Sequence, residues 1–85
     1  MKILFHEKAF DEYLYLQKND NKTLERLNNI IKNIKRNLYE GLGKPEPLRY
    51  ALQGYRSRRI TLEDRIIYKV ENDNLIIISC AKHYE

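Results

Sequence analysis

Residues 22–37, KTLERLNNIIKNIKRN, carry the clearest periodic pattern in the chain. Their apolar side chains recur at the spacing of one helical face, at Leu24, Leu27, Ile30, Ile31 and Ile34. The pattern predicts an amphipathic helix that packs its apolar stripe on a core. Most charged residues of this segment, such as Glu25 and Lys32, lie off the stripe and form either a solvated face or a docking surface.

A second helical pattern precedes it at residues 8–17, with apolar side chains at Ala9, Phe10, Tyr13 and Leu14. The same spacing turns Asp11, Glu12 and Lys18 outward. Residues 19–21, Asn-Asp-Asn, break this helix and offer a side-chain cap to the next one. Two helices joined by so short a turn are expected to pack as an antiparallel hairpin.

The remaining apolar runs predict strands at residues 3–5, 48–53, 55–61, 65–70 and 75–79, with a hairpin turn at 71–74. Between the helices and the later strands, Gly41, Gly43, Pro45 and Pro47 predict an ordered loop. The order of elements indicates an α+β fold. In this fold an N-terminal strand and a two-helix hairpin pack on one face of a mostly antiparallel sheet, and the other face carries the arginines.

Length and composition describe one folded domain that spans residues 1–85, with 42% hydrophobic and 33% charged residues. The single cysteine, Cys80, excludes a disulfide framework and a multi-cysteine zinc site, and it is predicted to be a small buried residue at a strand end. The N-terminus lacks the pattern of a signal peptide, and no apolar stretch approaches the ~20 residues of a membrane span. A cytoplasmic protein without a membrane contact is expected.

Positive charge is concentrated in residues 44–70, where seven basic and three acidic residues account for the formal net charge of +4. Such a segment is typical of a surface that binds a phosphate-rich partner. The candidate RNA- or phosphate-binding residues are Lys44, Arg49, Arg56, Arg58 and Arg59. On a strand Arg56 and Arg58 face one way and Arg59 the other, and plain solubility charge is the alternative for any one of them.

Three further residues could carry chemistry. Glu46, held between two prolines, is a candidate general base or a structural counter-ion. His83 is a candidate general acid that follows the last predicted strand, whereas His6 leads into the first helix and is expected to cap or pack there. Arg65 is a candidate hydrogen-bond donor to a phosphate, or a local ion-pair partner of Glu63 and Asp64.

A base, an acid and several cations are the groups needed to cleave RNA through its own 2′-hydroxyl. No cluster in the sequence has the ligand spacing of a divalent metal site. A route without a metal or a cofactor is therefore expected.

The chain resembles YoeB/Txe-type toxins of the RelE superfamily from end to end. The resemblance rests on DEYLYLQ at residues 11–17, GKPEPL at 43–48, SRRIT at 57–61 and the closing pair His83 and Tyr84. It implies a ribosome-dependent mRNA endonuclease that cuts mRNA in the ribosomal A site, tends to form homodimers and is neutralised by a YefM-type antitoxin. Arg49, where relatives often have lysine, and the tail residues Ala81, Lys82 and Glu85 depart from the family pattern.

Carried onto this chain, the resemblance makes Glu46 the general base and His83 the general acid. Arg65 would stabilise the phosphate with help from Arg49 and Arg59, and Tyr84 would orient the substrate or the leaving group. Two other functions stay open. The chain could bind ribosomal RNA and block translation without catalysis, or it could inhibit DNA gyrase as ParE-like toxins do.

Overall fold

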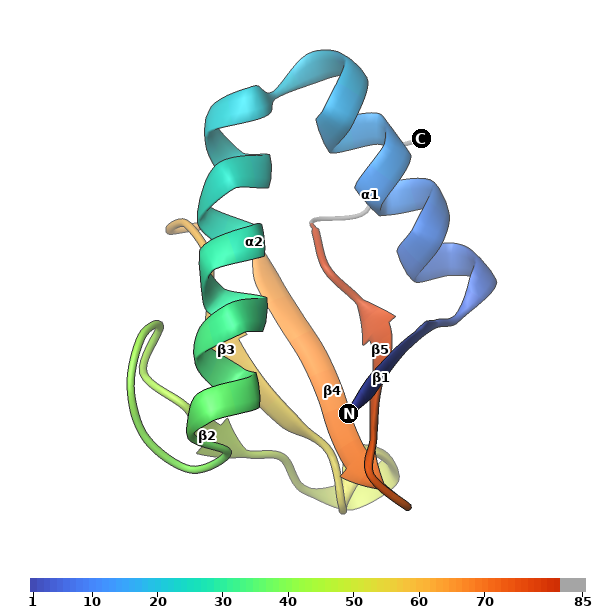
Figure 1. Ribbon diagram of the computed structural model, residues 1–85, viewed down its shortest axis with the longest axis vertical. Helices are drawn as coiled ribbons and strands as arrows, with labels where there is room; N and C mark the ends of the chain where they lie inside the picture. Colours follow the sequence, from blue (N-terminus) through green and yellow to red (C-terminus); the bar gives the residue numbers. More distant parts are fainter. Residues whose placement is uncertain (82–85) are drawn as a thin grey trace.

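Two helices cover one face of a five-stranded sheet in the computed structural model, which describes residues 1–81 (Figure 1). In chain order the elements are β1 (Lys2–Phe5), α1 (Glu7–Asn19), α2 (Asn21–Arg36), β2 (Glu46–Pro47), the 3₁₀-helix η1 (Tyr50–Leu52), β3 (Arg56–Arg59), β4 (Arg65–Glu71) and β5 (Asn74–Ser79). The sheet order is β1-β5-β4-β3-β2, and all neighbours are antiparallel except β1 and β5. The predicted α+β fold is confirmed.

The helical hairpin forms where the sequence predicts it. Asp20 separates the two helices and caps α2, because its carboxylate accepts hydrogen bonds from the backbone N and the Oγ1 of Thr23, at 3.1 and 2.8 Å. These hydrogen bonds favour the charged form and lower the pKa of Asp20. The predicted stripe of α2 is buried at Leu27, Ile30, Ile31 and Ile34. Neither helix in the described part of the chain is long and apolar enough to cross a membrane.

Strands β4 and β5 form a tight hairpin whose side chains make up the sheet side of the core. Its turn residues, Asn72 and Asp73, both have positive φ, at 52° and 60°, which short polar side chains tolerate and which suits the twist of a two-residue turn. Ile66 and Tyr68 of β4 are fully buried beneath the helices, in line with the alternation of this strand. Leu75 and Ile77 of β5 are fully buried beside them.

The segment around η1 differs from the prediction. Residues 48–53 do not form a strand, since Tyr50–Leu52 turn as a 3₁₀-helix. The backbone N of Leu48 donates to the O of Tyr55 across this turn. Within the predicted ordered loop, Glu46 and Pro47 form a short edge strand on β3. An edge strand tolerates proline because one side of it needs no backbone donors.

Glu12 also differs from the prediction, because it is buried and does not face solvent. Its Oε1 accepts hydrogen bonds from Ser79 Oγ at 3.1 Å and from the backbone N of Cys80 at 2.9 Å. Glu12 therefore fastens α1 to the end of β5. The spacing of Ala9, Glu12 and Leu16, which are all buried on α1, is the sequence signal that places Glu12 on the apolar stripe.

Candidate active site

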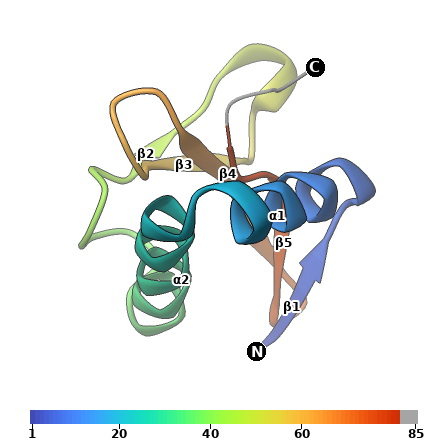
Figure 2. The same cartoon turned by 90° about the horizontal axis from the view of Figure 1, so that it is seen from above.

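A shallow cleft of about 80 Å³ lies on the sheet face that the helices leave uncovered. Figure 2 shows both helices on one side of the sheet. The cleft is on the other side, because Arg65 alternates along β4 with Ile66 and Tyr68, which point into the core. The residues that line the cleft are Gly43, Lys44, Glu46, Ser57, Arg59 and Arg65.

Strand pairing brings these residues together from three segments. Glu46 of β2 pairs with Ser57 of β3, and Arg59 of β3 pairs with Arg65 of β4. The backbone N of Arg59 donates to the O of Gly43 at 2.6 Å, which continues the contact between the loop and β3 beyond β2. Alternation therefore places Glu46, Arg59 and Arg65 on one face.

The carboxylate of Glu46 forms an ion pair with the guanidinium of Arg65. Arg65 Nη1 lies 3.1 Å from Glu46 Oε1, and the two side chains are 45% and 56% exposed. The pair holds the carboxylate against β4 and leaves it open to solvent. Glu46 is thus accessible to a substrate that enters the cleft.

Among the described residues, positive charge exceeds negative charge in this cleft, because Lys44, Arg59 and Arg65 surround the carboxylate of Glu46. Arg59 and Arg65 lie directly opposite each other on neighbouring strands, an arrangement in which like charges repel. Lys44 also has a left-handed backbone, with φ at 52°, a strained conformation that often occurs at functional sites. The site is suited to an anion such as a phosphate.

Arg58, predicted to bind RNA phosphate, has a structural role instead. It faces the helices and is completely buried. Its guanidinium donates five hydrogen bonds within residues 1–81, to Asn33 Oδ1, Tyr68 Oη and the backbone O atoms of Asn37, Glu40 and Leu42. Apart from Tyr68, which is on β4, these acceptors lie at the carboxyl end of α2 and in the loop that follows, where a cation also complements the helix dipole. The prediction is wrong because strand alternation alone does not reveal which face the loop covers.

The other predicted basic residues lie apart from the cleft. Arg49 is exposed at the start of η1 and does not line the cleft. Arg56 shares the helix-facing side of β3 with Arg58, and its Cζ lies 5.1 Å from the centre of the Tyr39 ring. The expectation that all the arginines share the open face is therefore wrong for Arg56 and Arg58.

The predicted acid, His83, and Tyr84 lie outside the described residues. The chain that leads to them is firmly held, because Cys80 is buried and its Sγ donates to the backbone O of Ala9 at 3.2 Å. Burial raises the pKa of the Cys80 thiol to about 12, with a smaller contribution from the charges of Glu12 and Asp64. Cys80 is therefore an inert packing residue, in line with its predicted burial.

Within residues 1–81, no group of three or more histidine, cysteine, aspartate or glutamate side chains is placed to hold a metal ion.

The comparison with known protein families gives a match over residues 5–84 to the YoeB-like toxins of bacterial type II toxin–antitoxin systems. The chain belongs to this family. Toxin YoeB from Synechocystis is 49% identical over 85 residues, covering 100% of this chain and 99% of the relative.

Solved structures of the YoeB-like family also share the fold. A YoeB/ParE toxin from Agrobacterium tumefaciens has 42% identity and a TM-score of 0.94, with 99% of this chain and 100% of that chain covered. The toxin in a heterotetrameric YoeB–YefM complex from Staphylococcus aureus has 45% identity and a TM-score of 0.92, with coverages of 99% and 98%. A YoeB dimer from the same organism has 45% identity and a TM-score of 0.90, with the same coverages.

Proposed function

We propose that this YoeB-like toxin is a ribosome-dependent mRNA endonuclease that acts in the cytoplasm. It cleaves mRNA in the ribosomal A site by attack of a 2′-hydroxyl on the adjacent phosphate and so inhibits translation. The observation that carries the proposal is the solvent-accessible carboxylate of Glu46, paired with Arg65 inside a cleft rich in positive charge.

In this reaction Glu46 takes the proton from the 2′-hydroxyl, and the 2′ oxygen forms a bond to phosphorus. The bond from phosphorus to the 5′ oxygen breaks, and His83 supplies a proton to the departing oxygen. The products are a 2′,3′-cyclic phosphate and a free 5′-hydroxyl. Tyr84 orients the leaving group, and no metal takes part.

The cations of the cleft stabilise the charge that develops during the reaction. Arg65 and Arg59 approach from neighbouring strands and donate to the phosphoryl oxygens, whose charge rises as the 2′ oxygen attacks. Lys44 adds a third cation at the rim, and Arg49, on the loop after β2, holds the RNA backbone farther away. Arg65 has a second function, since its contact with Glu46 orients the base before substrate arrives.

The test compares Glu46→Gln with Glu25→Gln, which removes the same charge from an exposed position on α2. In a reconstituted translation system, mRNA cleavage is measured by mapping new 5′ ends. We expect Glu46→Gln to slow cleavage by about 10²–10⁴-fold, the usual contribution of a positioned base, while ribosome binding persists. Glu25→Gln should cleave at the wild-type rate. Normal cleavage by Glu46→Gln would show that Glu46 is not the base.

Replacing the 2′-hydroxyl at the cleaved nucleotide by hydrogen tests the attacking group directly. Cleavage should stop at that position, because the nucleophile is missing. A toxin that merely occupies ribosomal RNA would block translation of both templates and leave no new ends. A gyrase inhibitor would suppress DNA supercoiling in a purified assay, where a nuclease has no effect.

The partners follow from the same proposal. The Staphylococcus aureus relative was solved in complex with YefM and as a dimer. We therefore expect a YefM-type antitoxin to neutralise this chain, and we expect the free toxin to be a homodimer.

A further inference from the structure

Arg56 differs from Arg58 in that at least one of its donors lacks a hydrogen-bond partner in the described part of the chain. The two side chains are two residues apart and therefore lie on the same side of β3. The guanidinium of Arg58 donates five hydrogen bonds. By contrast, Nε of Arg56 is buried and has no hydrogen-bond partner within residues 1–81. The interaction that the described chain offers this guanidinium is the ring of Tyr39. A buried donor without an acceptor is costly, so this one indicates an acceptor that comes from outside.

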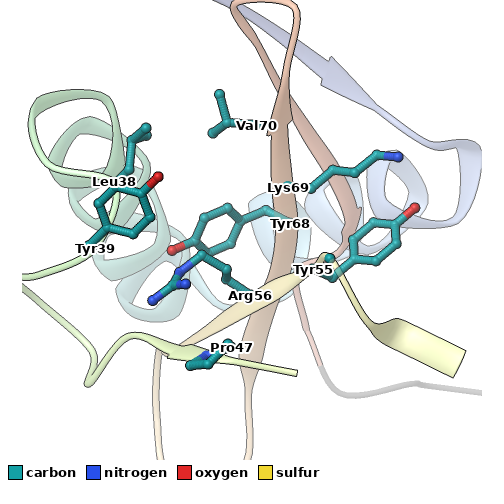
Figure 3. Close-up of a pocket in the computed structure, with 9 residues that line it drawn as sticks. Leu38, Tyr39, Pro47, Tyr55, Arg56, Tyr68, Lys69 and Val70 are labelled. Carbon is teal, nitrogen blue, oxygen red and sulfur yellow. The ribbon is translucent and has the colours of Figure 1, made fainter. Parts of the chain in front are cut away.

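A pocket of about 220 Å³ lies beside this donor (Figure 3). Its lining residues are Leu38, Tyr39, Pro47, Gly54, Tyr55, Arg56, Tyr68, Lys69 and Val70, and we call it the Arg56 pocket. It forms where β4 runs past the beginning of β3, because Arg56, the first residue of β3, pairs with Tyr68 and β4 continues to Glu71. Figure 3 shows Tyr39 and Val70 on the same side of β4 as the Arg56 guanidinium.

The charges in the Arg56 pocket favour an electron-rich ligand. Among the described residues, no acidic side chain lines the pocket. Lys69, the second cation, already pairs with Glu71 at 3.3 Å and lies 5.1 Å from the ring of Tyr55. The charge of Arg56 has no carboxylate partner in the described chain, so Arg56 is the group that a ligand would satisfy.

The Arg56 pocket adjoins the candidate active site through β2. Pro47 lines the pocket and pairs with Arg56, while Glu46 lines the cleft and pairs with Ser57. Because β2 is the edge strand of the sheet, a chain that passes around this edge contacts the cleft on one face and the pocket on the other. A polymer bound at Glu46 can thus place a neighbouring unit at Arg56.

We propose that the Arg56 pocket binds the base of a single-stranded RNA nucleotide next to the nucleotide that is cleaved. A base stacks on an aromatic ring such as that of Tyr39, which is 67% exposed, and the apolar side chains of Leu38 and Val70 complete the wall. The forked donors of Arg56 match the O6 and N7 acceptors of guanine, so guanine is the best-fitting base. This inference rests on the proposed nuclease function, of which the pocket is a specificity subsite.

The test uses short 2′-O-methyl RNAs, which cannot be cleaved through a 2′-hydroxyl, and measures their binding to the purified protein by fluorescence anisotropy. Four sequences differ only in the base beside the central nucleotide. We expect the guanine-containing RNA to bind best, and Arg56→Gln to weaken its binding by about tenfold or more. Arg56→Lys keeps the charge but lacks the fork, and it should lose the preference for guanine.

Lys32→Gln is the matched control, because it removes the same charge from an exposed position on α2. It should change binding by less than about twofold, the effect of net charge alone. Circular dichroism checks that each variant is folded. Equal binding of all four RNAs by the wild type and by Arg56→Gln would overturn the inference. Displacement of the RNA by an acidic peptide through Arg56, without any base preference, would assign the pocket to a protein partner and overturn it as well.

The two proposals fail in distinguishable ways. If Glu46→Gln abolishes mRNA cleavage but Arg56→Gln binds RNA like the wild type, the base subsite fails and the nuclease stands. If the wild type never cleaves mRNA but its RNA binding depends on Arg56, the nuclease fails, and the pocket stands as an RNA-binding site but not as a subsite for cleavage.

Discussion

Two arginines contact the segment between α2 and β3 from opposite sides of the sheet, and their surroundings differ completely. Arg58 reaches it from the helix side, is fully buried and donates to five neutral acceptors. Arg65 reaches it from the open side, is half exposed and contacts the single carboxylate of Glu46. The same side chain thus serves as a structural cross-link on one face and as an accessible cation on the other.

The difference shows how this fold separates stability from chemistry. A buried guanidinium whose donors are all used cannot exchange its partners for a substrate, because each lost hydrogen bond would leave a buried donor unpaired. An exposed ion pair is worth little to stability, so its partners can be released to a ligand at small cost. The buried arginine fixes the segment and thereby frees the exposed one for binding.

Replacing Arg58 by lysine is the strongest way to break this contrast. Lysine keeps the charge but presents a single ammonium, which cannot reach acceptors spread over Asn33, Tyr68 and the loop carbonyls. We expect Arg58→Lys to lower the free energy of unfolding by about 3–5 kcal/mol, as measured by urea denaturation. The control, Arg59→Lys, changes an exposed position and should stay within about 0.5 kcal/mol of the wild type. Equal stabilities of the two variants would contradict the structural role of Arg58.

Gly43 tests how closely the loop must lie on β3. It has φ at +82°, and a Cβ there would lie 2.6 Å from the backbone O of Arg59, closer than the van der Waals radii of the two atoms allow. We expect Gly43→Ala to lower the free energy of unfolding by about 2–3 kcal/mol and to slow mRNA cleavage, because the loop positions Lys44 and Glu46.

Gly54→Ala is the matched control, since Gly54 also has positive φ, at +94°, but a Cβ there would meet nothing within 4 Å. It should show the backbone strain alone, about 1 kcal/mol. The difference in unfolding free energy between the two variants therefore measures the clash with β3. If the difference is zero, the loop can move away from β3 without penalty.

The sequence predicts those parts of this fold that follow from local periodicity. The stripe of α2, the cap at Asp20 and the turn at Asn72 and Asp73 depend on neighbours within a few residues, and each of these predictions is confirmed. Strand alternation likewise predicts which face of β4 is buried. These features need no knowledge of how distant segments pack.

Apart from the local 3₁₀ turn at Tyr50–Leu52, the failures concern contacts over long separations. Arg58 is buried because Asn33, 25 residues away, and the loop after α2 cover its side of β3, and local alternation does not contain that information. Glu12 is drawn into the core by Ser79 and Cys80 from the other end of the chain. For the candidate site, the sequence identified Glu46, Arg59 and Arg65, which the structure brings together, but it grouped them with Arg56 and Arg58, which lie on the opposite face.

Removing the carboxylate of Glu46 has a small expected effect on stability, and the dependence of this effect on salt sharpens the contrast. Glu46→Gln breaks an exposed ion pair, so the free energy of unfolding should change by less than about 1 kcal/mol at 0.1 M salt. This change in unfolding free energy should fall toward zero at 1 M salt, because the added salt shortens the Debye length from about 10 Å to about 3 Å. The charges of Lys44, Arg59 and Arg65 are then screened from one another.

The loss in Arg58→Lys should persist at 1 M salt, because salt does not screen hydrogen bonds inside the core. Urea denaturation of both variants at the two salt concentrations separates the two kinds of contact. A destabilisation of several kcal/mol in Glu46→Gln, unchanged by salt, would mean that contacts on the open face also stabilise the fold. In that case the loss of cleavage expected for Glu46→Gln could no longer be assigned to the removal of a catalytic base.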